Sequence, residues 1–274
     1  MNILIIGYAG YIGPVLVDQL IKNKKYSLTG IDTGYFEKKH IFKNNKYKNF
    51  KTIVKDVREI KKSDLINIDA IVYLAAISND PMGNKFQKVT HEINYKSALK
   101  VANLAKKNGV SKFIYASSCS MYGFTSTLPK TERSGLNPLT AYAKSKVLAE
   151  KKLKKISTKN FKIICLRFAT ACGYSKNIRL DLVLNDFVAS AITSKKIVVL
   201  SDGSPWRPMI HVVDMARAIN WSIEVKIKKN FLAINAGSSS MNYQIKDIAK
   251  KVGKIIKGTN ISINSAALPD KRSY

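Results

Sequence analysis

Three glycines spaced three residues apart follow directly on a short apolar run at the start of the chain. Residues 3–6 have the length of a buried strand, and residues 11–22 form an amphipathic stretch. Gly7 allows a tight turn, Gly10 leaves no Cβ between the backbone and a phosphate, and Gly13 lets the next helix pack closely on the strand. Such a trio also fits a loop that merely turns, but its place between a strand and a helix predicts a dinucleotide site. The residues assigned to this site are Gly7, Gly10, Tyr11, Ile12 and Gly13.

Over the first 170 residues, short apolar runs alternate with stretches that carry apolar residues at helical spacing. Continuously apolar strands in such an alternation are typical of a parallel sheet that helices cover on both faces. The sequence therefore predicts the α/β class, as a Rossmann-type doubly wound parallel sheet. Its strands are expected at 3–6, 27–31, 51–54, 70–74, 112–116 and 162–166, and its helices at 11–22, 86–108 and 141–156.

After about Thr170 the pattern loosens into short helices and brief strands. This change predicts a smaller, partly interleaved substrate lobe. We expect a nucleotide-binding Rossmann domain over residues 1–170, with a return of some later elements, and the substrate lobe over residues 171–274. The elements expected in the second part are helices near 181–193, 213–225 and 243–256 and strands at 197–200 and 232–234.

A net charge of +29 would suit a surface that binds nucleic acid. Of the 47 basic residues, however, only seven are arginines, and the lysines are scattered over nearly every exposed stretch. Nucleic-acid readers rely on arginine and on interleaved aromatic residues. We therefore interpret the charge as a solvated, lysine-rich surface and expect no nucleic-acid partner.

Cysteine and histidine are too rare in this chain to suggest a disulfide framework or a zinc site. The three cysteines contain no Cys-x-x-Cys pair, and with only three histidines this argues against disulfides and a zinc site, so no metal is expected. No apolar run approaches the length of a membrane span, and the chain starts with a strand rather than a signal peptide. We expect a cytoplasmic protein without a membrane partner.

Asp32 ends the second expected strand and bears on the choice of cofactor. A carboxylate there can accept hydrogen bonds from both ribose hydroxyls of an adenosine, and it would repel a 2′-phosphate. Because no arginine is nearby to offset such a phosphate, the sequence favours NAD over NADP, although Asp32 also fits a turn before Gly34. Further residues expected to line the cofactor at strand ends are Asp56, Val57, Ala75 and Ala76.

Tyr142 and Lys146 lie four residues apart, on one face of a helix that starts near Thr140. A free tyrosine has a pKa of about 10 and is a poor base at neutral pH, but a nearby ammonium favours its phenolate. Two other tyrosines have a lysine at this spacing, Tyr35 and Tyr47, but both fall in a polar loop. Only Tyr142 follows a strand end that carries two serines and opens a long amphipathic helix.

Taken together, these motifs resemble the extended short-chain dehydrogenase/reductases. The closer resemblance is to their NAD-dependent epimerase/dehydratase branch, which acts on nucleotide sugars. The motifs follow in the same order over essentially the whole chain. They are Gly7-x-x-Gly-x-x-Gly13, Ala75-Ala76, Asn94, Ser117-Ser-Cys-Ser-Met-Tyr-Gly123 and Tyr142-x-x-x-Lys146.

The resemblance implies a role for each matching residue. Tyr142 is implied as the general acid/base, and Lys146 as its electrostatic partner and a ribose ligand. Ser118 is implied to hydrogen-bond the reacting oxygen, and Asn94 to help hold the active-site helix through backbone or water contacts. Without the resemblance, Ser118 also fits a turn serine and Asn94 a surface amide.

The residues after Ser118 narrow the reaction. The family's sugar 4,6-dehydratases and glucuronate decarboxylases carry a carboxylate there, whereas this chain has Cys119 and Ser120. Elimination of water needs an additional acid and base, so this departure argues against dehydration and that decarboxylation. We expect an epimerase that oxidises a sugar hydroxyl, at C4, and returns the hydride to the other face while retaining NAD. A nucleotide-sugar 4-dehydrogenase or 4-ketoreductase remains the alternative.

Several residues are expected to contact a nucleotide-diphosphate sugar. Arg207 suits a diphosphate, because a guanidinium matches phosphate oxygens, and the resemblance adds two more arginines and an asparagine. Each could instead form ion pairs at the surface or between lobes. His211 is expected to be a buried structural residue rather than a base. The substrate set is Ser78, Asn79, Ser118, Arg179, Asn185, Arg207 and Arg272.

The resemblance also implies a homodimer, formed through the expected helices 86–108 and 141–156. Family members usually continue for a few dozen residues beyond the position of Tyr274, so the substrate lobe over residues 171–274 is expected to lack the usual family tail. A non-catalytic Rossmann protein that binds nucleotides or nucleic acid is the most distant alternative.

Overall fold

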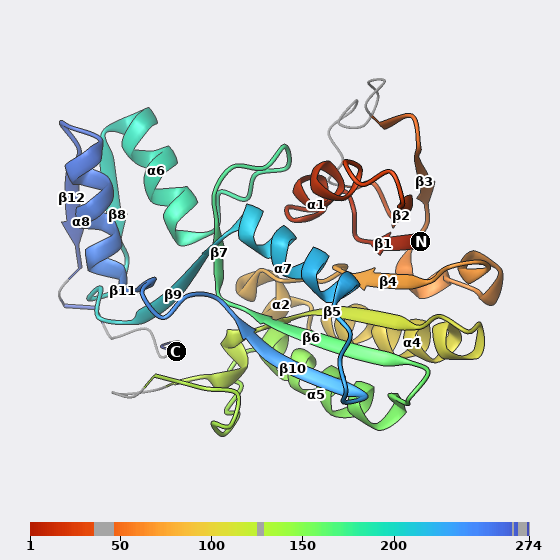
Figure 1. The fold of residues 1–274 in the computed structure, drawn as a ribbon. Coiled ribbons are helices and arrows are strands. Elements are labelled where there is room, and N and C mark those ends of the chain that lie inside the picture. The colour runs from red at the N-terminus through yellow and green to blue at the C-terminus, as the bar shows by residue number, and fades with distance from the viewer. Residues whose placement is uncertain (36–46, 125–128, 265, 268–272, 274) are drawn as a thin grey trace.

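A parallel sheet of seven strands forms the centre of the computed structural model, which describes residues 1–35, 47–124, 129–264, 266–267 and 273 (Figure 1). Its strand order is β10-β6-β5-β4-β1-β2-β3, and every neighbouring pair runs parallel. This confirms the expected Rossmann-type α/β class. The strands are β1 (Asn2–Ile6), β2 (Ser27–Asp32), β3 (Phe50–Val54), β4 (Ala70–Tyr73), β5 (Lys112–Ser118), β6 (Lys162–Phe168) and β10 (Phe231–Ala236).

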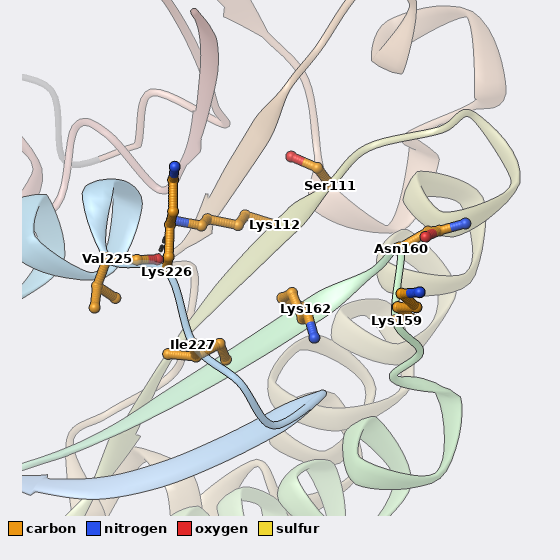
Figure 2. A pocket seen from close by; sticks show the side chains of 8 residues that line it. All are labelled: Ser111, Lys112, Lys159, Asn160, Lys162, Val225, Lys226 and Ile227. Atoms are coloured by element: carbon orange, nitrogen blue, oxygen red, sulfur yellow. Dashed lines mark hydrogen bonds between the residues drawn. The ribbon is translucent and has the colours of Figure 1, made fainter.

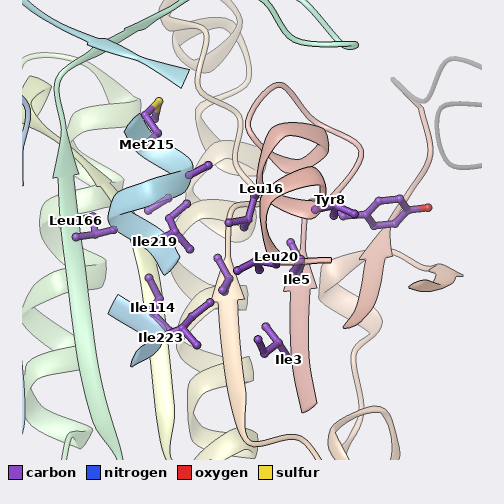
Figure 3. Packing of buried hydrophobic residues seen from close by; sticks show 14 of the residues in the cluster. Ile3, Ile5, Tyr8, Leu16, Leu20, Ile114, Leu166, Met215, Ile219 and Ile223 are labelled. Carbon is purple, nitrogen blue, oxygen red and sulfur yellow. The ribbon is translucent and has the colours of Figure 1, made fainter. Parts of the chain in front are cut away.

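Helices cover both faces of this sheet, and alternate residues of each strand face opposite layers. Ile3 and Ile5 of β1 pack in a cluster with residues of α1 (Gly13–Leu20) and α7 (Val212–Glu224), as Figure 3 shows. Leu4 and Ile6 belong to a second cluster that includes residues of α4 (Ala98–Lys107) and α5 (Ala141–Ile156). Because both faces are buried at the centre of the sheet, β1 and β4 are apolar almost throughout, whereas the edge strand β3 exposes Lys51, Thr52 and Val54.

The remaining elements form a smaller region with its own core. Phe187, Ile197, Met209 and Ile248 share a buried cluster there. Its two small sheets have the orders β11-β9-β7 and β12-β8. The elements are β7 (Thr170–Cys172), α6 (Val183–Ser194), β8 (Lys196–Val199), β9 (Trp206–His211), β11 (Asn242–Gln244), α8 (Ile245–Ile255) and β12 (Asn260–Ile263).

The chain returns from this region to the large sheet. After β9, α7 packs against α1 and β10 pairs with β6 at the edge of the sheet. These are the kind of later elements that the sequence pattern led us to expect in the first domain. The division near residue 170 itself stays a prediction.

The helix expected over residues 86–108 is confirmed as one continuous helical stretch, formed by α3 (Gln87–His91), the π-helix η4 (Glu92–Ser97) and α4. A separate short helix, α2 (Asp80–Lys85), precedes it. Phe86 ends α2 with a non-helical backbone, at φ −118° and ψ 53°. Apolar spacing could not reveal the wider turn of η4, which is of a kind that often marks functional sites.

Candidate active site

The glycine-rich loop leaves β1 and enters α1 under close steric constraint. Gly7 has a φ of +88°, and a Cβ there would lie 2.6 Å from the amide nitrogen of Ala75. A Cβ on Gly13 would lie 2.0 Å from the carbonyl oxygen of Tyr8, so no side chain fits at either position. A Cβ on Gly10 would meet only the carbonyl oxygen of Gly7, at 3.5 Å. The loop is thus tightly packed at both ends and open at Gly10, which fits the approach of a pyrophosphate.

The Asp32 carboxylate lies beside this loop. One of its oxygens accepts a hydrogen bond from the amide of Ala9 (3.1 Å), and the other accepts one from the amide of Gly34 (3.0 Å). Asp32 therefore stabilises a turn, which was the alternative role that the sequence left open for it. Its carboxylate is also fixed at the carboxyl end of β2, where a ribose would bind in a Rossmann site.

Other residues assigned to the cofactor lie at neighbouring strand ends. Ala75, followed by Ala76, comes after β4, and its amide donates to Ile6 (3.0 Å). Val57 is buried, and Asp56 begins the short helix η2 (Val57–Glu59). The hydrogen bonds from Arg58 lower the pKa of Asp56. Because parallel strands end at the same edge, these residues and the glycine-rich loop share one edge of the sheet.

Lys146 connects helix α5 to strand β5. Its side chain is 1% exposed, and its Nζ donates a hydrogen bond to the carbonyl of Ala116 (2.7 Å). The same Nζ lies 4.6 Å from the ring centroid of Tyr115 and 5.4 Å from that of Tyr142. Burial lowers the pKa of Lys146 to about 7. The structure thus brings the predicted Tyr142–Lys146 pair together and holds it against the strand that ends in Ser118.

Ser118 ends β5 and begins the short helix η5 (Cys119–Tyr122). Its Oγ accepts a hydrogen bond from the amide of Ser120 (3.2 Å) and donates one to the Ser120 hydroxyl (2.9 Å). Ser118 is therefore a turn serine, which was the alternative to a role in the reaction. It also lies at the edge of the sheet where the contacts of Lys146 place Tyr142.

Asn94 is fully buried in the π-helix, so it is not a surface amide. Its carboxamide pairs with both the amide nitrogen and the carbonyl oxygen of Ile77, at 2.8 and 2.9 Å. It also donates to the hydroxyl of Ser145 (3.1 Å), which donates in turn to the carbonyl of Tyr142 (2.6 Å). Asn94 thus contacts helix α5 through the side chain of Ser145, in addition to its contacts with the backbone of Ile77. The resemblance implied backbone or water contacts.

Three residues expected to bind substrate meet in one network. Arg179 donates to the hydroxyl of Ser78 (2.6 Å) and pairs with Asp181 (2.6 Å). Asn79 donates to the same carboxylate (2.8 Å). Arg179 hydrogen bonds lower the pKa of Asp181 to about 2. The charge of Tyr142 also acts on the pKa of Arg179, so this network lies near the tyrosine that is predicted to be the acid/base.

Two other residues expected to bind substrate make structural contacts. Asn185 is buried and bonds the amide of Gly173 (2.9 Å) and the carbonyl of Arg179 (3.0 Å). Arg207 is buried in β9 and donates to the carbonyl of Trp206 (2.9 Å). Arg272 lies outside the described residues. The expectation of a buried His211 is wrong: it is exposed and caps α7, accepting from the amide of Val213 (3.2 Å).

Sequence reasoning missed a buried polar network behind Ser118. Glu150 pairs with Arg167 (2.8 Å) and accepts from the hydroxyl of Ser117 (2.6 Å). Arg167 also donates to Tyr122 (2.9 Å), whose hydroxyl donates to Asn235 of β10 (2.6 Å). The network joins α5, β5, β6 and β10. Glu150 lies one helical turn after Lys146, and this spacing was the available signal.

A cavity of about 410 Å³ lies at the opposite edge of the sheet, where β5 and β6 begin (Figure 2). Lys112 donates there to the carbonyl of Val225 (2.7 Å), which closes the end of α7. Among the described residues that line it, no side chain that could give up a proton is positioned beside one that could take it up. We therefore assign the chemistry to the carboxyl edge. The lining residues are Ser111, Lys112, Lys159, Asn160, Lys162, Val225, Lys226 and Ile227.

Within the part of the chain that the structure describes, no three His, Cys, Asp or Glu side chains gather in a way that could hold a metal ion. None of its helices is both long and apolar enough to cross a membrane.

Sequence comparison gives relatives over most of the chain. The NAD dependent epimerase/dehydratase family matches residues 3–237. The chain is 28% identical over 232 residues to an uncharacterized UDP-glucose epimerase, YtcB, of Bacillus subtilis (strain 168), covering 80% of this chain and 71% of that protein. It is 26% identical over 275 residues to a UDP-glucose 4-epimerase of Lactobacillus helveticus, covering 92% and 82%.

Solved structures share the fold. The UDP-glucuronic acid 4-epimerase from Bacillus cereus, in complex with UDP-glucuronic acid and NAD, superposes with a TM-score of 0.82 and 26% identity, covering 100% of this chain and 90% of that chain. MoeE5 in complex with UDP-glucose and NAD has a TM-score of 0.84 at 22% identity, covering 100% and 88%, and shows similarity of fold alone.

Proposed function

The chain belongs to the NAD-dependent epimerase/dehydratase family, and we propose that it is a nucleotide-sugar epimerase that acts at the C4 hydroxyl and keeps NAD bound through its cycle. The observation that carries this proposal is the buried Lys146, which lies beside Tyr142. It is held at the strand that ends in Ser118, and no carboxylate follows Ser118 there. Epimerisation needs one acid/base at the reacting hydroxyl, whereas dehydration needs more.

The chain's own residues would hold the dinucleotide and move one proton. The open Gly10 suits the pyrophosphate, and the carboxylate of Asp32 suits the ribose. When bound, NAD supplies a reversible hydride acceptor. Tyr142, as the phenolate, takes the proton of the sugar hydroxyl and later returns it; the Lys146 charge stabilises the phenolate before the first step and after the second, and Ser118 hydrogen-bonds the reacting oxygen.

Cys119 supports the choice of reaction. Its thiol is buried and donates to the carbonyl of Arg167 (3.1 Å), and burial raises its pKa to about 12. A thiol of this kind stays neutral at physiological pH and is a poor proton donor to a leaving hydroxyl. Ser120 is already paired with Ser118. Neither position therefore supplies the second acid that elimination of water requires.

A panel of nucleotide sugars tests this function. Purified protein is incubated with UDP-glucose, UDP-glucuronic acid and UDP-N-acetylglucosamine, with no added cofactor, and the products are identified by NMR. These sugars are chosen because they appear in the names of the relatives or their ligands. A C4 epimer is the expected product. In a parallel reaction with excess NAD added, build-up of NADH in proportion to the sugar consumed would instead establish the alternative, a 4-dehydrogenase or 4-ketoreductase.

The assembly is also open to test. We propose a homodimer that pairs through α4 and α5, in the arrangement expected for the family. Both helices expose lysines, among them Lys107 and Lys151, so a contact between two copies through these helices would bring like charges together. The dimer fraction measured by light scattering should therefore rise with ionic strength, because salt screens this repulsion. A cytoplasmic location and a role in carbohydrate biosynthesis stay predictions.

A further inference from the structure

A short segment of the second region reaches back to the glycine-rich loop. It comprises residues 173–177, follows β7 and is called the strap below; in Figure 1 the green chain after β7 extends toward α1. The Ser175 hydroxyl donates to the carbonyl of Tyr11 (2.7 Å), and the Asn177 amide donates to the carbonyl of Ala9. The Tyr11 hydroxyl donates to the carbonyl of Gly173 (2.6 Å). The strap therefore binds the residues on both sides of Gly10.

These contacts are shielded from water. Ser175 is 1% exposed, Tyr11 is 7% exposed and Asn177 is 8% exposed. A hydrogen bond in such a place is costly to break, because the freed groups would remain buried without partners. Opening the glycine-rich loop away from the strap would thus require three buried bonds to break together.

Both ends of the strap are anchored. Gly173 has a φ of +103°, and a Cβ there would lie 2.3 Å from Nε2 of His211, so only glycine allows this approach to β9. Toward the other end, Lys176 lies 3.7 Å from the carboxylate of Asp18 on α1 and contacts the hydroxyl of Tyr47. The strap is thus held to both regions, and it closes over the segment that connects β1 to α1.

Asn177 has a further property that points to a ligand. Its carboxamide oxygen is buried and has no hydrogen-bond partner among the residues that the structure describes. The same side chain bonds the residue, Ala9, whose amide is held by Asp32. An acceptor thus remains available next to the place assigned to the adenosine ribose, and such a group normally finds a donor.

We propose that the strap, through Ser175 and Asn177, locks the glycine-rich loop around NAD and so prevents its release between the two halves of the reaction. The inference rests on the proposed function, because an epimerase must return the hydride to the same sugar before its cofactor leaves. Release then requires the strap to open first, and the opening sets the dissociation rate.

The test measures cofactor release without any sugar present. Protein loaded with radiolabelled NAD is chased with excess unlabelled NAD, and the bound label is followed by rapid filtration. The double variant Ser175→Ala/Asn177→Ala should release NAD about tenfold faster or more, because each lost bond weakens closure.

Matched controls separate this effect from general destabilisation. Ser194→Ala and Asn242→Ala each remove a side-chain bond to a carbonyl elsewhere in the second region. They should leave the release rate within about twofold of the wild type. Thermal unfolding of all variants, measured without NAD, shows whether the strap variants remain folded at the temperature of the chase.

The outcomes distinguish the two proposals. A double variant that releases NAD at the controls' rate would overturn the strap's role, whatever the reaction is. Fast release from the double variant supports the strap even if wild-type protein converts no sugar to its epimer, a result that would count against the proposed function alone. The two single variants are measured in the same way. If only Asn177→Ala accelerates release, the Asn177 carboxamide is a ligand of NAD, and the proposal that Ser175 helps to close the loop is wrong.

Discussion

The two ends of the candidate active site are built in different ways. At the catalytic end, Lys146 is 1% exposed and bonds a main-chain carbonyl of the sheet. At the sugar end, the side chains of Arg179 and Asp181 are 27% and 38% exposed and bond mainly other side chains on loops. A partner in the main chain of a buried strand is fixed by the fold, whereas a network of loop side chains can change with few substitutions. We expect chemistry to be set at the first end and sugar selectivity at the second.

The largest effect is expected at the catalytic end. Tyr142→Phe removes the proposed acid/base and should lower kcat by about 10²–10⁴-fold. The variant should still copurify with NAD, since the glycine-rich loop and Lys146 are unchanged. Epimerisation and bound NAD are measured on the same preparation. A variant that keeps more than a tenth of its activity would remove Tyr142 from the mechanism.

The polar network behind Ser118 should dominate stability. Glu150→Ala leaves Arg167 buried without its partner and should lower the free energy of unfolding by about 3–5 kcal/mol. Asp214→Ala breaks the exposed pair with Arg217, whose side chains are 51% and 71% exposed, and should cost less than about 1 kcal/mol. Urea unfolding of both variants gives the comparison. Equal losses would contradict the view that burial separates the two pairs.

A change at the sugar end should alter substrate binding more than chemistry. Asp181→Asn removes the charge that holds Arg179 against Ser78, so the guanidinium should lose its fixed position. We expect KM for the nucleotide sugar to rise by about tenfold and kcat to change little. Steady-state kinetics over the sugar panel make the measurement, with Asp186→Asn, an exposed residue in the first turn of α6, as a control. A fall in kcat without a rise in KM would place the network in the chemical step.

The smallest effects concern pH, and stability should rise with pH at both ends, over different pH ranges. Burial lowers the pKa of Lys146 from 10.5 to about 7, so the folded cofactor-free protein binds fewer protons than the unfolded chain between these values. Its contribution to stability should rise with pH in this window, by at most about 1.4 kcal/mol per pH unit. In Lys146→Met this part of the slope should vanish.

Asp181 acts in the acid range. Arg179 lowers its pKa from 3.8 to about 2, so its stabilising contribution is present above about pH 4 and is lost as the pH falls toward 2. Unfolding followed from pH 6 to pH 2, in the wild type and in Asp181→Asn, measures this loss as a difference in slope. Identical slopes would show that the ion pair does not persist in solution.

The sequence was most informative where a function depends on neighbours along the chain. The glycines of the loop, Asp32 at a strand end and the Tyr142–Lys146 spacing are all local patterns, because strand and helix periodicity place them. It was least informative where partners are distant. Asn94 meets Ser145 across 51 residues, and Tyr11 meets Gly173 across 162. The strap, the Glu150–Arg167 pair and the contact of Asp181 with Asn79, 102 residues away, were missed for this reason. His211 was wrongly placed in the interior.

By itself, the sequence determined the class of fold, the cofactor edge and the candidate catalytic set, since apolar periodicity and glycine positions act through the local backbone. The tertiary structure decided what surrounds that set. Only the packed chain shows that Lys146 is desolvated, that Arg179 already has a carboxylate partner and that residues 173–177 lie against the glycine-rich loop. Burial and long-range hydrogen bonds depend on which elements the topology makes neighbours, and no spacing along the chain records this.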